Sequence, residues 1–285
     1  MRDDFAVFVL SHGRAAELKT ISALHRSGYT GKWYVIVDNE DDQVSQYQEI
    51  FGEEHIIVFD KAAVGETFDI MDNFGGRQVP TFARNAVYPI ANKLGLKYFF
   101  ESDDDLYRFR VRVLMPDGAL RTKYITNMDA VVEAYLEYMD NTQIDVLAFG
   151  QTGDLIGGTG SSLWSDQYIR KAMQGFFVRV SNPITYVGRF NDDVNAYVDA
   201  GKVGHILITY RDVIMDTYAT QQHTGGITES YKKYGTYVKS FYSVMLDPSC
   251  VKISVVGDIA YRLHHSINWE NAVPKIISSD FKKGD

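Results

Sequence analysis

Cysteine is almost absent from this chain of 285 residues, which contains only Cys250. A single thiol cannot form an intramolecular disulfide, and it cannot supply the set of thiolates that a structural zinc site requires. Because disulfides accumulate in oxidising compartments, the composition favours a reducing one. We therefore expect a cytoplasmic protein.

Long apolar runs and an excess of positive charge are missing as well. No stretch approaches the roughly 18 apolar residues of a membrane span. The first residues also lack the apolar core of a signal peptide, so we expect no membrane association. Lys+Arg number 29 against 37 Asp+Glu, giving a net charge of −8. That balance does not by itself indicate a nucleic-acid-binding protein, although a local basic patch can still bind DNA.

The first 60 residues alternate between buried-strand and helix patterns with short loops. Strand patterns at 5–10, 33–37 and 55–59 are separated by a helical pattern from about Ala15 and by a second one that ends near Phe51. This β-α-β-α-β order is typical of a parallel, doubly wound sheet. The turn after the first strand, Ser11-His12-Gly13-Arg14, lacks the GxGxxG fingerprint of dinucleotide folds, which argues against a nicotinamide or flavin enzyme.

An aromatic run leads directly into three consecutive acids, Asp103, Asp104 and Asp105. The run predicts a buried strand, so the acids lie at its carboxyl end, where open α/β sheets bind ligands. Carboxylates this close repel one another unless a cation lies among them, and hard oxygen ligands suit Mg²⁺ or Mn²⁺. The alternative is a solvated turn. Arg84, in the first turns of a helix that Pro80 begins, is expected near the same strand ends.

The segment that follows alternates at period two from Tyr107 to Val113 and places Arg108, Arg110 and Arg112 on one face. A turn at 115–118 and the cation Lys123 beyond it predict a β-hairpin. The arginine face has two interpretations. It is either a phosphate-binding surface beside the metal or an edge strand protected by charge.

Two later features carry candidate chemistry. Asp192 and Asp193 precede a helix, where they can act as a general base or merely cap the helix. His223 lies in a Gln-rich loop that ends in two glycines. It can be a metal ligand or an ordinary hydrogen-bonded loop residue.

The order of these features resembles the GT-A family of nucleotide-sugar glycosyltransferases. The resemblance implies a GT-A-like, Rossmann-like α/β fold: a mixed, mainly parallel sheet flanked by helices, with an inserted β-hairpin. It implies a DxD motif whose metal, Mn²⁺ or Mg²⁺, bridges the two phosphates of a UDP-sugar donor. The implied metal ligands are Asp103, Asp105 and His223. The implied nucleotide-sugar contacts are Ser11, Arg14, Asp38, Arg84, Asp103 and Asp104. The implied base is Asp192 or Asp193.

A narrower resemblance follows from Val79-Pro80-Thr81-Phe82-Ala83-Arg84-Asn85, the acidic strand end, the arginine strand and the His-Gly-Gly loop. These features together look like the TET-associated group of phage glycosyltransferases that modify hydroxymethylated pyrimidines in DNA. That relation implies double-stranded DNA carrying 5-hydroxymethylcytosine as acceptor, a location in the host cytoplasm, and no obligate protein partner. The implied DNA contacts are Arg108, Arg110, Arg112 and Lys123.

We therefore predict one glycosyltransferase domain over 1–285, a hexosyl- or pentosyltransferase. Its nucleotide-binding half spans 1–106, its acceptor-side half 107–240 and a C-terminal extension 241–285. Three alternatives remain open: a glycosyltransferase that acts on a glycan or small polyol, a GT-A-like nucleotidyltransferase that releases pyrophosphate, and a nucleic-acid-binding module on an inactive transferase fold. The transferred sugar, the stereochemical outcome and the oligomeric state are left open by the sequence.

Overall fold

The computed structural model describes residues 1–155, 158–161, 164, 168–217, 231, 233–257 and 261–276. In chain order its first elements are β1 (Phe5–Leu10), α1 (Thr20–Arg26), β2 (Lys32–Asp38), α2 (Val44–Phe51), η1 (Glu53–His55), β3 (Ile56–Phe59), α3 (Lys61–Gly65), α4 (Thr81–Lys93), β4 (Tyr98–Asp103), β5 (Leu106–Leu114), β6 (Leu120–Tyr124) and α5 (Met128–Asp140). The remainder are β7 (Val146–Gln151), η2 (Gly158–Gly160), β8 (Tyr168–Ile169), β9 (Phe176–Arg179), α6 (Asp192–Val203), β10 (Leu207–Thr217), η3 (Thr236–Val238), α8 (Lys239–Leu246), β11 (Val251–Val256) and β12 (Arg262–Ile267).

One large sheet organises the molecule, with strands in the order β3-β2-β1-β4-β9-β7-β10-β5-β6 and with β8 pairing β10. Strands β1 to β4 are parallel to one another, whereas β9 runs antiparallel between β4 and β7. Strands β5 and β6 form the predicted hairpin at the edge. The structure thus confirms the predicted class, a mixed α/β sheet with a parallel N-terminal half and an inserted hairpin.

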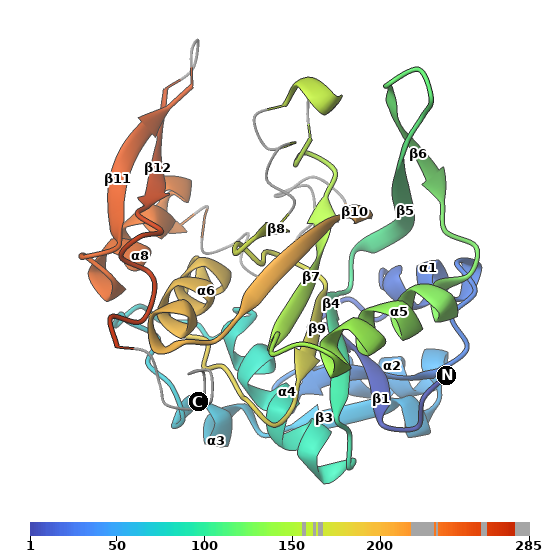
Figure 1. Cartoon of the computed structure of the whole chain (residues 1–285). Helices are drawn as coiled ribbons and strands as arrows, with labels where there is room; N and C mark the ends of the chain where they lie inside the picture. The colour runs from blue at the N-terminus through green and yellow to red at the C-terminus, as the bar shows by residue number, and fades with distance from the viewer. Residues whose placement is uncertain are drawn as a thin grey trace, which may run out of the picture.

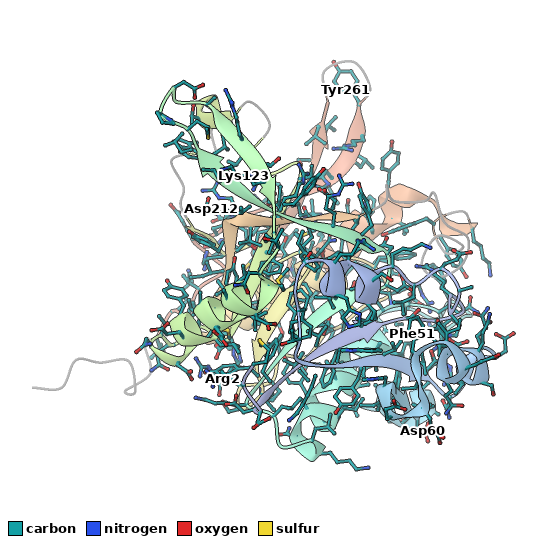
Figure 2. All side chains as sticks on the ribbon, turned by 90° about the vertical axis from the view of Figure 1, so that its right-hand side faces the viewer. Arg2, Phe51, Asp60, Lys123, Asp212 and Tyr261 are labelled. Carbon is teal, nitrogen blue, oxygen red and sulfur yellow. The ribbon has the colours of Figure 1, made fainter. Side chains whose placement is uncertain are left out.

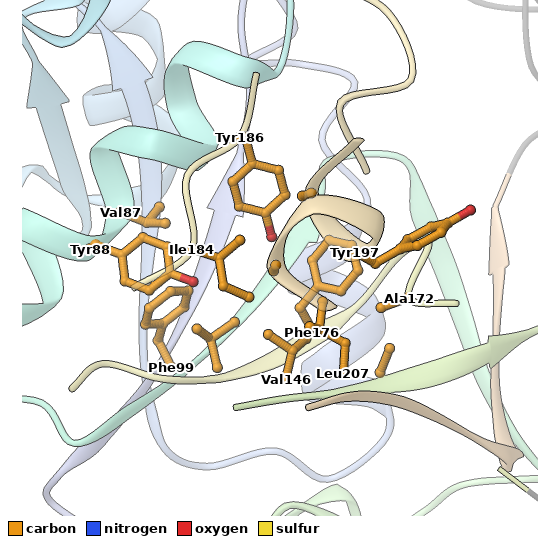
Figure 3. Close-up of a cluster of buried hydrophobic side chains, with 14 of the residues drawn as sticks. Val87, Tyr88, Phe99, Val146, Ala172, Phe176, Ile184, Tyr186, Tyr197 and Leu207 are labelled. Carbon is orange, nitrogen blue, oxygen red and sulfur yellow. The ribbon is translucent and has the colours of Figure 1, made fainter. Parts of the chain in front are cut away.

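Helices cover both faces of the central part of the sheet, which explains why β1 is apolar and buried at every position. On one face Phe5, Val7 and Val9 of β1 pack with residues of α1, α2 and α5. On the other face Ala6, Phe8 and Leu10 pack with residues of α4 and α6. Figure 3 shows part of this second cluster, where Phe99 and Phe176 of the sheet lie beneath Tyr88 of α4 and Tyr197 of α6.

The start of the first helix differs from the sequence prediction. It begins at Thr20 instead of near Ala15, because residues 14–18 form turns in which the Arg14 carbonyl accepts hydrogen bonds from the N–H groups of Glu17 and Leu18. Strand β10 continues to Thr217, and its pairing with β7 shifts register between Tyr210 and Ile214. The shift bends the strand, as bulges do.

A separate two-stranded sheet joins β11 to β12. The sequence predicted β11 but did not predict a strand over 262–267. Figure 1 shows the β5–β6 hairpin and the β11–β12 hairpin rising above the same end of the large sheet, one on either side of the ends of β7 and β10. The view turned by 90° agrees, with Lys123 and Tyr261 on the two projecting hairpins (Figure 2). Within the described ranges, no helix is long and apolar enough to cross a bilayer.

Candidate active site

The three acids after β4 have different surroundings. Asp104 is buried, and its carboxylate accepts hydrogen bonds from Ser11 Oγ at 2.6 Å and from Arg14 Nη1 at 2.9 Å. The Asp103 side chain is 46% exposed and the Asp105 side chain is partly exposed. Neither of these two carboxylates accepts a side-chain hydrogen bond from the described residues. Asp104 therefore fixes the loop after β1, and Asp103 and Asp105 are the two acids open to a ligand.

The electrostatics of these acids fit a divalent cation. Burial, together with repulsion from Asp103 and Asp104, raises the pKa of Asp105 to about 7. A bound cation would remove that repulsion, and two carboxylates with phosphate oxygens and water make up a common Mg²⁺ site. No group of three His, Cys, Asp or Glu side chains in the described part of the chain forms a complete metal site. The predicted third ligand, His223, lies outside the described residues.

Arg84 lies at the centre of the site, in the first turn of α4, and is buried. Its Nε lies 3.2 Å from Asp192 Oδ2 and 3.6 Å from Glu101 Oε1, and its Nη2 lies 3.8 Å from Asp103 Oδ1. One guanidinium therefore connects the acidic end of β4 to the acid pair of α6, although more than 100 residues separate Arg84 from Asp192. These carboxylates raise the pKa of Arg84 even though burial opposes the charge.

Glu101 is a member of this cluster that the sequence reasoning missed. It is buried within the aromatic strand β4, and burial raises its pKa to about 8, with Arg84 opposing the shift. Its Oε2 has no hydrogen-bond partner among the described residues. The signal was available, because a glutamate inside an otherwise apolar central strand is rarely buried without a charged partner.

The acid pair opens α6, and its two members differ in exposure. Asp192 is buried against Arg84, whereas Asp193 is partly exposed and its Oδ1 accepts the Val194 N–H at 2.8 Å. Burial and the charge of Asp192 raise the pKa of Asp193 to about 6. A carboxylate with this pKa and with solvent access is a competent proton acceptor near neutral pH.

Asn191 holds the N-terminus of α6 in place through contacts with other elements. It adopts a left-handed conformation with φ +54°, which is uncommon for residues other than glycine, and its side chain makes no capping bond. Instead, its Nδ2 donates to the Lys239 carbonyl at 2.9 Å and lies 3.3 Å from both Ser243 Oγ and His265 Nδ1. Asn191 thus fixes α6 to α8 and β12.

The predicted nucleotide-binding residues gather where β1 and β2 end. Asp38 is buried, 2.7 Å from His12 Nδ1 and 3.2 Å from Lys61 Nζ. Burial opposes ionisation, but the His12 hydrogen bond and the Lys61 charge lower the pKa of Asp38. The next turn is fixed similarly, because the Gly13 N–H donates to Asp41 Oδ2 at 2.8 Å. His12, Lys61 and Asp41 were not predicted as site residues.

The arginines of β5 do not form a uniform outer face. Arg108 is exposed and lies over the rings of Tyr107 and Tyr124. Arg110 is partly exposed and pairs with Asp216. Arg112 is buried, and its guanidinium donates to the carbonyl of Arg211 and, at 2.7 Å, to that of Gln151.

This arrangement corrects the prediction of a shared phosphate-binding face. The guanidinium of Arg112 is occupied by backbone carbonyls left by the irregular pairing of β7 with β10. Strand alternation placed the three side chains on one face but said nothing of which neighbours cover it. Lys123 on β6 is exposed, as is Arg121, which pairs with Asp117, so Arg108 and Lys123 are exposed cations of this hairpin without an ion pair among the described residues.

Comparison with known proteins adds a family to this geometry. The model of the family described as TET-Associated Glycosyltransferase matches residues 5–226. A search of curated proteins finds no match. Among solved structures, the chain is similar to glucosyl-3-phosphoglycerate synthase from Mycobacterium tuberculosis, solved with Mn²⁺, UDP and phosphoglyceric acid. Identity is 9%, the TM-score is 0.46, and 92% of this chain and 86% of that chain are covered.

A second similar structure is that of S. aureus TarS residues 1–349 in complex with UDP. Its identity is 13% and its TM-score 0.44, over 76% of this chain and 61% of that chain. Likeness at this level carries no inference about substrates. The family match is different in kind, because it spans most of the chain and includes β4, Arg84 and the acid pair. The chain belongs to the TET-associated glycosyltransferase family and is a glycosyltransferase.

Proposed function

We propose that this enzyme transfers a sugar from a UDP-sugar to the hydroxyl of 5-hydroxymethylcytosine in DNA, with Mn²⁺ or Mg²⁺ held by Asp103 and Asp105. The observation that carries the proposal is the arrangement around Arg84. The buried Arg84 guanidinium lies between Asp103, a half-open carboxylate at the end of β4, and Asp192, the first member of the acid pair that opens α6. A transferase of this class needs both groups together, one to bind the donor diphosphate and one to receive a proton.

The metal site in this proposal consists of two oxygen ligands and the donor's own phosphates. When bound, the cation stabilises the negative charge that grows on the leaving diphosphate. Asp104 takes no part in ligation, because its carboxylate is already bonded to Ser11 and Arg14. Asp104 instead orients the loop after β1, which together with Asp38 forms the side of the site assigned to the nucleoside.

Within the acid pair we assign the proton acceptor to Asp193. Asp192 is buried in the ion pair with Arg84, which leaves it little access to an acceptor hydroxyl. Asp193 is partly exposed and lies next to that charge. The acceptor hydroxyl gives its proton to Asp193 as its oxygen bonds to the anomeric carbon, and the diphosphate leaves with the electron pair of the old bond.

The DNA acceptor rests on the family and on the β5–β6 hairpin. Arg108 and Lys123 are exposed there beside Tyr124, which is 65% exposed. Cations interspersed with an exposed aromatic ring suit phosphates and unstacked bases. An extruded base is needed because a hydroxymethyl group in a stacked duplex is poorly accessible to an active site.

The decisive test is incubation of the enzyme with a panel of nucleotide-sugars, Mn²⁺ and duplex DNA that contains 5-hydroxymethylcytosine, followed by nucleoside mass spectrometry. We expect a hexose or pentose mass on the modified nucleoside with a UDP-sugar, and none on cytosine DNA. Asp105→Ala should abolish the product, whereas Lys93→Ala, at the far end of α4, should not. Transfer of the sugar to glycans or polyols with release of UDP, while the DNA is recovered unmodified, would refute the DNA acceptor.

A further inference from the structure

Five basic side chains converge on the N-terminus of α6, and the function proposed above uses none of them. Lys171 follows β8, Lys239 begins α8, and β12 contributes Arg262, His264 and His265. The rings of His264 and His265 lie 4.3 Å apart. They come from three parts of the chain that are far apart in sequence, and the segment after β8, α8 and β12 must fold together to assemble them.

Contacts with α6 fix the position of this cationic cluster. Helix α8 packs on β11, β12 and α6. Asn191, directly before the acid pair, contacts both the Lys239 carbonyl and the His265 ring. The cluster is therefore next to Asp193. Its Lys171 and Lys239 charges both act on that carboxylate.

The cluster carries an excess of positive charge. Within the described ranges, Lys171, Lys239 and Arg262 form no ion pair, and the nearby carboxylate of Asp193 interacts with Lys171 and Lys239 at longer range. The histidines lie in the resulting field. Burial lowers the pKa of His264, and the charges of Arg262, Lys239 and Lys171 lower it further. Cations held together repel one another, so a bound anion would stabilise this position.

We propose that the cationic cluster binds a backbone phosphate of the acceptor DNA. This inference rests on the proposed function and assigns it a second contact surface. The donor diphosphate is assigned to Asp103 and Asp105, and the Arg84 guanidinium lies between Asp103 and Asp192. Groups on the other side of the acid pair therefore face the acceptor, and a phosphate there belongs to the acceptor strand.

The shape of the molecule agrees with this assignment. The β5–β6 and β11–β12 hairpins project above the same end of the sheet with the ends of β7 and β10 between them (Figure 1). Arg108 and Lys123 are exposed on one hairpin and Arg262 on the other. A duplex seated between the hairpins would have its phosphates contacted from both sides, while a base extruded from it reaches the acid pair. The second hairpin lies beyond residues 5–226, so the family match does not include it.

The test compares wild-type enzyme with Lys171→Ala, Arg262→Ala and the double variant on hydroxymethylated duplex DNA. Binding is measured by fluorescence anisotropy over a series of salt concentrations. Each lost phosphate contact should lower the slope of log K against log salt by about 1, so the double variant should lose about 2. The Lys171→Arg and Arg262→Lys variants should restore most of it. Lys93→Ala, an exposed lysine that is not part of the cluster, should keep the wild-type slope.

Donor-side measurements separate the possible failures. The KM for the UDP-sugar, measured by its hydrolysis without DNA, should be unchanged in the double variant. A raised donor KM would overturn the inference, because the cluster would then hold the donor. An unchanged salt slope in the double variant would also overturn the inference. In that case, transfer of sugar to DNA by the wild-type enzyme would still support the proposed function. If wild-type enzyme transfers no sugar to duplex DNA, the proposed function fails, and this site loses its ligand with it.

Discussion

Replacement of Arg84 by methionine should destabilise the fold strongly, because it keeps an unbranched side chain but removes the guanidinium. The guanidinium lies over the rings of Phe176 and Tyr186. Among the described residues it is also the cation that faces the carboxylates of Glu101 and Asp192, both buried, at 3.6 and 3.2 Å. Loss of one partner from a buried ion pair costs about 3–5 kcal/mol. We expect a loss of that size in the free energy of unfolding, measured by urea denaturation at neutral pH.

The loss should also depend on pH, with a definite sign. Without Arg84 the pKa of Glu101, already raised to about 8, rises further, and that of Asp192 rises as well. The folded variant then binds more protons than the unfolded chain, so its stability falls as pH rises, by up to about 1.4 kcal/mol per pH unit for each proton held. The deficit relative to wild type should be larger at about pH 8 than at about pH 5.5.

Two further variants make this prediction refutable. Adding Glu101→Gln to Arg84→Met removes one stranded carboxylate and should recover part of the stability. Arg77→Ala breaks the exposed pair with Glu40 and should cost about 0–1 kcal/mol. A loss below about 1 kcal/mol for Arg84→Met, or a loss that does not change with pH, would show that the guanidinium does not neutralise these acids.

Three other predictions concern the acids and their support. Mn²⁺ at about 100 times its Kd should raise the free energy of unfolding by about 2.7 kcal/mol; Asp105→Ala should abolish this gain in thermal unfolding, and Asp104→Asn should keep it. Activity should fall as pH drops below about 6, where Asp193 takes up a proton. In Asp192→Asn the acidic limb of the pH–rate profile should move to lower pH, because a negative charge beside Asp193 is gone. An acidic limb that does not move would contradict the assignment of Asp193. Asn191→Ala should lose about 1–3 kcal/mol by urea denaturation, because it forfeits hydrogen bonds and strains a left-handed backbone, whereas Asn191→Gly should lose less.

Much of the fold could be predicted because the sheet is buried on both faces. Every residue of β1 is buried, and such a strand leaves a continuous apolar run in the sequence. The same holds for the aromatic half of β4. The β5–β6 hairpin was predictable because its alternation and its turn are local features. The β11–β12 pairing was not, since a half-exposed strand such as Arg262–Ile267 has no comparable apolar signature.

The candidate site was predictable in its members but not in their partners. Arg84, Asp103 and Asp192 were each singled out from local pattern, yet nothing local indicates that one guanidinium contacts both acids. Arg112 illustrates the same limit. Its position in the alternation was predicted correctly, but its environment depends on a register shift in β10, and pairing irregularities are set by tertiary contacts.

The three consecutive acids have different surroundings because β4 ends among them. Strand β4 ends at Asp103, and the chain then turns at Asp104 and Asp105 into β5. In this turn the side chain of Asp104 points to the loop after β1, whereas those of Asp103 and Asp105 stay partly exposed. The buried acid is consequently the one that takes Ser11 and Arg14 as partners. Only Asp103 and Asp105 can share a cation. Replacing either of them by glutamate or asparagine should therefore lower activity most, whereas the same replacement of Asp104 should lower the stability of the fold most.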